Sequence, residues 1–343
     1  MRRFAGLITS PAHAMMPTDE PLVIGTKTTA GAELPVGMGW GHYCASGVAP
    51  YEFLANPPSG RGAFSQHELF QRVGVPWKGC VESRTPPHDV TDQPATPTNI
   101  ATQWWPAFWP DDGNVNNWIT TNHNEPKGWL MTLNDVAILK YNLTAPKSIM
   151  ESPPKTKGPN KGCPEPILPL TSNISNFNKY INDLSHWDSG GTVISEGVGW
   201  GWRVLSPDAP FTEGAPYGKT TRKILVVMSD GANEIMSTNN VWQSQYTAYG
   251  PLWWNAKFPR PWTYENGRKF LDERTLAACT NAKAAGVEIF MVLFRQADVQ
   301  ARTLFENCAS STTNVFSADS PAALENAFND IAAKALVQVR ITK

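Results

Sequence analysis

Two short segments of this sequence have the oxygen chemistry of a divalent-cation site. Ser229-Asp230-Gly231-Ala232-Asn233 directly follows an apolar run, so Asp230 would stand at the carboxyl end of a buried strand, where open α/β sheets bind ligands. Gly190-Gly191-Thr192 is a glycine-rich loop that presents a hydroxyl at a helix start. Hydroxyl and carboxylate oxygens suit Mg²⁺, Mn²⁺ or Ca²⁺ rather than zinc. We therefore predict that Thr192 and Asp230 are ligands of a divalent cation. Alternatively, Thr192 caps the helix that follows it and Asp230 belongs to an ordinary turn.

The motifs of common enzyme classes are missing from the sequence. The six histidines show no H-E-x-x-H spacing, and no G-x-S-x-G elbow, P-loop or dinucleotide fingerprint occurs. A group of acids near tryptophans makes a carbohydrate-active or other hydrolytic enzyme the alternative function. Glycosidases combine paired acids with aromatic platforms that bind sugars. The group consists of Asp89, Asp92, Asp111 and Asp112 beside Trp104, Trp105 and Trp109. The simpler interpretation is that these acids cap turns and that the tryptophans form a small loop core.

The five cysteines, Cys44, Cys80, Cys163, Cys279 and Cys308, contain no C-x-x-C pair, so a zinc cage is not expected. Cys279 and Cys308 lie on the helices predicted on either side of one strand, and packing on the same face would bring them within bridging distance. Cys80 with Cys163 is a second candidate disulfide, which leaves Cys44 over. Such bridges require an oxidising compartment such as a periplasm.

The elements that must position these residues begin near Thr171, where apolar residues first recur at three- and four-residue spacing. Helices alternate with strands from there to the end, which predicts βαβ units and an α/β fold with a mainly parallel sheet flanked by helices. The expected helices are 171–184, 192–202, 272–286, 297–307 and one from 320. The expected strands are 223–228, 287–294, 315–316 and a last one over 337–341.

Residues 1 to about 170 are rich in Pro, Trp, Asn and Gly and poor in periodic apolar segments. Proline removes a backbone donor and pushes the preceding residue toward extended conformations, so loops, turns and short strands are expected. The N-terminal stretch 1–14 superficially resembles a signal peptide, but Pro11 interrupts its short apolar run, and an ordinary terminus is expected.

The charge balance argues against whole classes of partner. The 343-residue chain has 29 Lys and Arg against 30 Asp and Glu, so it has no general attraction to nucleic acid or to an anionic membrane. No run approaches the ~20 consecutive apolar residues that a transmembrane helix needs.

Several strings together resemble one protein family. GGTVISEGVGWGWRVLSPDAPF, KILVVMSDGAN, TNAKAAGVEIFMVLF and NCASS resemble the von Willebrand factor A (vWA) domain of TadG-like proteins, which belong to bacterial tight-adherence (Flp-type) pilus systems. WKGCVESRTPPHDVTD, WPAFWPDD and CPEPILPLT resemble the long insertion that such proteins carry inside that domain. The resemblance covers roughly Trp77 to Lys343.

The resemblance implies a Rossmann-like vWA domain with a metal-ion-dependent adhesion site. Thr192 would match the threonine of the second motif of that site and Asp230 the aspartate of the third. The expected organisation is an N-terminal segment 1–76 of uncertain role, an insertion 77–170 and the C-terminal part of the α/β domain, 171–343.

The function implied is that of a non-enzymatic pilus assembly or adhesion protein, periplasmic or otherwise associated with the cell envelope. It would bind protein partners of the pilus machinery, with Mg²⁺, Mn²⁺ or Ca²⁺ as the bridging cofactor, and would reach the membrane only through an anchor absent from this chain.

The sequence departs from the family at the first motif, Asp-x-Ser-x-Ser, whose nearest approximation is Asp183-Leu-Ser-His-Trp187. We therefore expect a piece of a longer protein, with a degenerate fragment as a further alternative. The strand 223–228 would then lie at an exposed sheet edge, unless residues 1–76 cover it.

Overall fold

The computed structural model describes residues 14–15, 70, 73–96, 99–109, 116–121, 147–149, 157–185, 191–218, 221–238, 244–252, 257–295 and 298–340. Most of the predicted N-terminal segment 1–76 lies outside these ranges, as do Cys44, Asp111, Asp112, Gly190 and Trp187.

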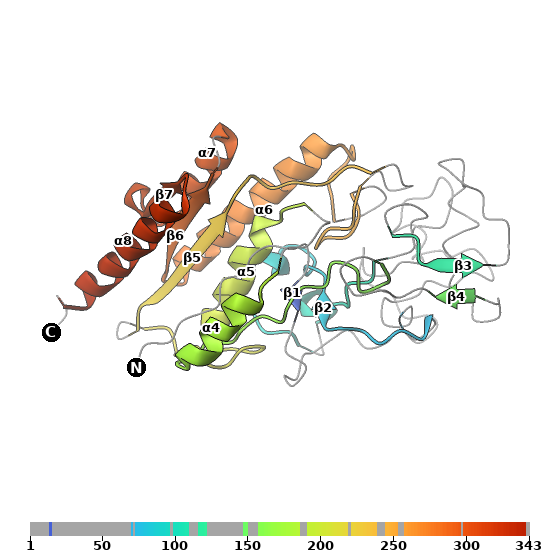
Figure 1. Ribbon diagram of the computed structural model, residues 1–343, viewed down its shortest axis with the longest axis horizontal. Helices are drawn as coiled ribbons and strands as arrows, with labels where there is room; N and C mark the ends of the chain where they lie inside the picture. The colour runs from blue at the N-terminus through green and yellow to red at the C-terminus, as the bar shows by residue number, and fades with distance from the viewer. Residues whose placement is uncertain are drawn as a thin grey trace.

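A parallel three-stranded sheet forms the centre of the C-terminal half (Figure 1). Its strands are β5 (Lys223–Ser229), β6 (Val287–Phe294) and β7 (Val315–Ala318), in the order β5-β6-β7. Lys223 pairs with Val287 and Met291 with Val315, both in parallel register. The predicted α/β class is confirmed by this sheet and by the helices on both of its faces.

The described helices are α4 (Ile174–Asp183), α5 (Ile194–Leu205), α6 (Tyr264–Ala284), α7 (Val299–Cys308) and α8 (Pro321–Arg340). Short 3-10 turns are η2 (His88–Val90), η3 (Ile100–Thr102) and η4 (Thr312–Asn314). Two small antiparallel ladders join β1 (Ala14–Met15) to β2 (Cys80–Val81), and β3 (Ile119–Thr121) to β4 (Lys147–Ile149). None of the described helices combines the length and the apolar character needed to cross a membrane.

Two of the predicted element boundaries are wrong. The strand expected over 337–341 is wrong for residues 337–340, which belong to α8. The helix continues there because residues 331–340 contain no Gly, Pro or Asn that would end it. Helix α6 begins at Tyr264 rather than near Asp272, because the Thr263 hydroxyl accepts a hydrogen bond from the Asn266 N–H at 3.1 Å and caps the helix.

The two faces of the sheet are covered by different helices, as Figure 1 shows. Leu225 and Val227 of β5 pack into a core with α5, α6 and α7. Ile224, Val226 and Met228 pack on the other face, against a cluster that includes Ile331 of α8. Strand β6 is buried along most of its length, whereas β5 alternates between buried and half-buried residues, because it is the outer strand. The expectation that β5 is buried on both faces is therefore met only in part.

Helix α5 lies unusually close to β5. A Cβ atom placed on Gly201 would come within 2.5 Å of a methyl carbon of Leu225, so a side chain at this position would require the Leu225 side chain to move. The glycine allows α5 to carry the start of the candidate site directly beside the strand that carries its other half.

The loop-rich segment folds around the predicted aromatic core. Trp104, Trp105 and Trp109 are each only 2% exposed, and the Trp104 ring stacks on Trp200 of α5 with 5.3 Å between centroids. Burial of these rings confirms the loop-core interpretation and excludes them as a sugar-binding platform, which needs exposed aromatic faces.

A buried charge network holds this segment against α5 and α6. The Asp89 carboxylate accepts two hydrogen bonds of 2.7 Å from Arg274 of α6 and one of 2.8 Å from the Tyr249 hydroxyl. Arg203 of α5 donates to the carbonyl oxygens of Asp89 and Thr91. The Arg84 guanidinium donates to three backbone carbonyls, those of Thr91, Gln93 and Thr102. The segment around η2 is thus fixed to the α/β core by charged side chains.

Two disulfides join parts of the chain that are distant in sequence. Cys279 of α6 is bonded to Cys308 of α7, with 5.2 Å between their Cα atoms. Cys80 of β2 is bonded to Cys163, with a Cα separation of 5.7 Å. These four cysteines leave Cys44 as the remaining one of the five.

Candidate functional site

The segments that carry Thr192 and Asp230 meet beyond the carboxyl end of β5. The Thr192 N–H donates to the Glu234 carbonyl at 3.0 Å, and the Glu234 N–H donates to the Thr192 carbonyl at 2.9 Å. Because Thr192 precedes α5 and Glu234 follows β5, this pair of bonds ties the helix start to the strand end. We call this region the carboxyl edge, comprising residues 191–194, 229–236 and 298–300.

Gly191 is required for this close approach of the two backbones. A Cβ atom at Gly191 would lie 1.8 Å from the Glu234 carbonyl oxygen, a distance that only a shift of the backbone could relieve. The glycine-rich loop noted in the sequence therefore has a packing role next to the candidate site.

Replacing Gly191 with alanine is expected to destabilise the protein by about 1–3 kcal/mol, because the added methyl group forces the two backbones apart. The free energy of unfolding, measured in urea, checks this. Gly197→Ala is the matched control: its Cβ meets nothing within 4 Å, and alanine in a helix should be neutral or stabilising by up to about 1 kcal/mol. Equal stability of the two variants would contradict the assigned contact.

Asn233 is the residue that caps α5. Its side-chain oxygen accepts from the Ile194 N–H at 2.8 Å, and its amide nitrogen donates to Asp272 at 2.8 Å and to Thr275 at 3.1 Å. The alternative prediction of Thr192 as the N-cap is wrong, because Val193 occupies that position and has no side-chain cap bond. Sequence reasoning missed the role of Asn233, although its place four residues after a buried strand was a usable signal.

Asp230 stands in a tight turn at the surface. The Ser229 hydroxyl donates to the Gly231 carbonyl at 3.0 Å and accepts from the Gly231 N–H at 3.2 Å, which closes the turn around Asp230. Asp230 is exposed, and Thr192 is half-buried. The structure thus brings the segments of the two predicted ligands to the same edge of the sheet.

The residues nearest to the missing first motif are engaged elsewhere. Asp183 forms an ion pair with Lys179 on the exposed surface of α4. The Ser185 hydroxyl donates to the Glu165 carboxylate at 2.8 Å. Within the ranges the structure describes, no group of three or more His, Cys, Asp or Glu side chains could hold a metal ion.

Thr192 and Asp230 have suitable oxygen chemistry, and Mg²⁺ or Ca²⁺ takes six or more oxygen ligands, several of which can be water. Cation binding by these two residues therefore stays a prediction, with the other ligand positions left to water or to residues outside the described ranges.

If Thr192 and Asp230 are the only side-chain ligands, titrating the chelator-treated full chain with Mg²⁺, Mn²⁺ or Ca²⁺ is expected to show no saturable binding and no rise in melting temperature. Isothermal titration calorimetry and thermal melting check this, with Asp230→Ala expected to behave like the parent. Saturable binding that raises the melting temperature and disappears in Asp230→Ala would show instead that further ligands complete the site.

The carboxyl edge also exposes apolar side chains. Met236, after β5, is 44% exposed, and Val299, the first residue of α7, is 75% exposed. Asp230 and Glu234 are exposed beside them in the sequence, and Asp298 caps α7 by accepting from the Gln300 N–H at 2.8 Å. Gln300 in turn donates to Asp272, which links α7 to the Asn233 cap. The segments that form this edge thus expose two apolar side chains, Met236 and Val299, and two carboxylates, Asp230 and Glu234.

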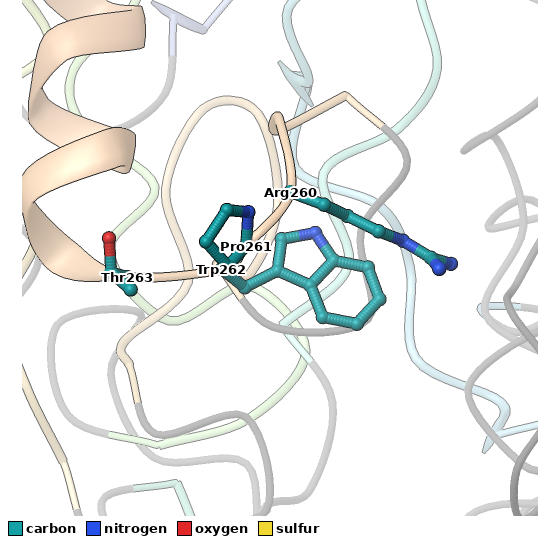
Figure 2. Close-up of a pocket in the computed structure, with 4 residues that line it drawn as sticks. All are labelled: Arg260, Pro261, Trp262 and Thr263. Atoms are coloured by element: carbon teal, nitrogen blue, oxygen red, sulfur yellow. The ribbon is translucent and has the colours of Figure 1, made fainter.

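A surface pocket of about 600 Å³ lies elsewhere, at the loop before α6 (Figure 2). It is lined by Arg260, Pro261, Trp262 and Thr263, and the Arg260 guanidinium lies 4.8 Å from the centroid of the Trp262 ring. This lining contains no carboxylate, imidazole or thiol, so it supplies no acid, base or strong nucleophile for hydrolysis.

Comparisons with known structures include two distant neighbours. No family model and no curated protein matches the chain. The pilus adhesin SpaC from Lactobacillus rhamnosus GG is 18% identical with a TM-score of 0.34, over 49% of this chain and 22% of that one. The von Willebrand factor domain of the type V pili tip protein Mfa5 from Porphyromonas gingivalis is 15% identical with a TM-score of 0.34, over 52% and 77% of the two chains. This chain thus spans about a fifth of SpaC, and its family remains a resemblance carried by the sequence segments.

Proposed function

We propose that this chain is a non-enzymatic, TadG-like protein of a bacterial pilus system, and that it acts at the cell envelope through contact with protein partners. One observation carries the proposal: the paired bonds between Thr192 and Glu234 unite the second-motif and third-motif segments of the vWA resemblance. They meet at the carboxyl edge of a parallel sheet, where α/β folds bind their ligands.

The chemistry of the carboxyl edge favours a protein partner. Exposed apolar side chains surrounded by polar ones are typical of a contact surface with a dry centre and a polar rim. Val299 and Met236 supply the apolar points, and the acids around them select a partner with complementary Lys or Arg residues.

Two main residues of the hydrolytic alternative, Asp89 and Trp104, are buried. Asp89 is buried and paired with Arg274, and Trp104 is buried against Trp200. A glycosidase needs carboxyl groups that reach a sugar in an open cleft. Asp111 and Asp112 lie outside the described residues and stay candidates for a glycan-turnover assay of Asp111→Asn.

The two disulfides support a location in an oxidising compartment, such as the periplasm or the outer face of the envelope.

We also propose that the insertion 77–170 is an integral part of the domain 171–343, because the Asp89, Arg203 and Arg274 network joins the two.

A complementation experiment tests this function. Val299→Glu and Asp230→Ala would be introduced into the full gene of the bacterium that encodes the chain, and surface pili would be counted by electron microscopy. Both variants are expected to reduce piliation or attachment while the protein level is unchanged. Asp330→Ala, an exposed acid on α8, is the control and should behave like the parent. Normal piliation in a strain that lacks the gene would overturn the proposal.

A further inference from the structure

An arginine directly after the central strand has a backbone conformation that normally belongs to glycine. Strand β6 ends at Phe294, and the next residue, Arg295, has a φ angle of 55°. Side chains disfavour this left-handed conformation because the Cβ atom crowds the following carbonyl oxygen. The other described residues with such a φ angle are all glycines, namely Gly74, Gly79, Gly158, Gly162, Gly250 and Gly286. Arg295 is therefore held in a strained conformation that a glycine would relieve.

The neighbouring strand β7 holds Arg295 in this conformation. Phe294 pairs with Ala318 in parallel register, and the Arg295 N–H donates to the Ala318 carbonyl at 2.8 Å. The Arg295 side chain is exposed, and its guanidinium carbon lies 5.0 Å from the centroid of the Phe294 ring. A guanidinium is attracted to the face of an aromatic ring. The strained backbone thus presents an exposed cation at a defined position.

The charges at the ends of the three parallel strands alternate in sign. Asp230 follows β5, Arg295 follows β6 and Asp319 follows β7, each as the first residue after its strand. All three residues are exposed. Ser229 pairs with Leu293 in parallel register, so Asp230 and Arg295 leave adjacent strands at nearly the same level. Because β6 lies between β5 and β7, Arg295 stands beside the carboxyl edge on the strand between those that end at the two acids.

We propose that Arg295 binds a carboxylate of the pilus partner, an aspartate or glutamate side chain, through paired hydrogen bonds from its guanidinium. The inference rests on the proposed function, because it names the chemistry of the partner at the same surface. The planar guanidinium matches a carboxylate with two parallel N–H···O bonds. Asp230 and Asp319 disfavour a densely charged anion such as nucleic acid, but they favour basic groups beside a single carboxylate. The partner surface is therefore expected to carry an acidic residue between basic ones.

Arg295→Gly in the full chain separates binding from stability. The substitution removes the side chain and the backbone strain together, so the melting temperature is expected to rise by about 2–4 °C. Binding to immobilised pili, sheared from the bacterium that encodes the chain, is expected to weaken about tenfold or more, because two charge-assisted hydrogen bonds are lost. Lys179→Gln is the control: it removes an exposed positive charge from α4, outside the carboxyl edge, and should leave binding unchanged.

Blocking the carboxyl groups of the pili as neutral amides, with a carbodiimide and glycinamide, tests the partner chemistry. The parent is expected to bind the blocked pili about tenfold more weakly, whereas Arg295→Gly should bind blocked and native pili about equally. Equal weakening of both proteins would overturn the proposal. Parent-like binding by Arg295→Gly would overturn it too, as would a lower melting temperature of this variant, which would assign Arg295 to the fold.

The failure of this proposal differs from a failure of the proposed function. Weak binding by Val299→Glu together with parent-like binding by Arg295→Gly would overturn only the role of Arg295. Absence of binding by the parent protein would overturn both.

Discussion

Asp89→Ala is expected to lower the free energy of unfolding by about 3–5 kcal/mol, which is the usual cost of removing one partner from a buried ion pair. The Asp89 side chain is fully buried and joins Arg274 through both carboxylate oxygens. Its loss leaves the partly buried Arg274 guanidinium without this counter-ion and removes one hydrogen-bond partner of the Tyr249 hydroxyl. Since whole domains are stable by only about 5–15 kcal/mol, the variant should unfold at much lower urea concentration.

Neighbouring buried charges increase the cost of removing the Asp89 carboxylate. Burial raises the pKa of Glu196 and lowers the pKa of Arg203, so the interior disfavours the charged form of each, and their mutual attraction opposes both shifts. Glu196 also accepts hydrogen bonds from Ser83 at 2.5 Å and from Trp200 at 2.9 Å. A network this deeply buried depends on every member being paired.

Asp183→Ala is the matched control for Asp89→Ala. Asp183 also pairs with a basic residue, Lys179, but its side chain is 54% exposed. Exposed pairs of this spacing contribute about 0.3–0.5 kcal/mol. Equal effects of the two variants in urea unfolding would contradict a buried, stabilising role for Asp89.

Removing the Cys80–Cys163 disulfide is the second large effect. The bond closes a loop with a sequence separation of 83 residues, and chain entropy predicts a loss of about 4–5 kcal/mol for the Cys80→Ser, Cys163→Ser double variant. The Cys279–Cys308 bond spans 29 residues, so its removal should cost about 3–4 kcal/mol, somewhat less.

Urea unfolding of the two double variants checks both the size and the order of these losses. Cys44→Ser measures the effect of replacing a cysteine outside the two bonds. Full stability of either double variant would contradict the assigned disulfide.

The sequence was most informative where the backbone follows a simple period. The predicted bounds of Val287–Phe294 are confirmed to the residue, because an eight-residue run of branched and aromatic residues bounded by Gly286 favours a buried strand over a helix. The end of the chain was predicted wrongly for the same reason. Val337, Val339 and Ile341 alternate like a strand, but α8 includes the first two and ends at Arg340, and Ile341 lies outside the described residues. Local propensity yields to a helix that is already nucleated.

The sequence indicated which segments form the site, but not the contacts between them. The position after a buried strand pointed to Asp230, and the glycine-rich loop to Thr192. Asn233 as the cap of α5 depends on three residues that lie 39 and 42 positions away. Arg84 and Arg203 donate to backbone carbonyls. Every residue type has such a carbonyl, so the sequence does not indicate these contacts.

Direct binding tests the central claim, that the carboxyl edge is the surface by which this protein contacts its pilus partner. The purified full chain would be passed over immobilised pili sheared from the bacterium that encodes it, with Val299→Glu and Asp330→Ala measured alongside. We predict saturable binding that weakens about tenfold or more in Val299→Glu, as expected for a contact hot spot, and that is unchanged in Asp330→Ala. Binding that is equally strong in all three proteins would contradict the claim.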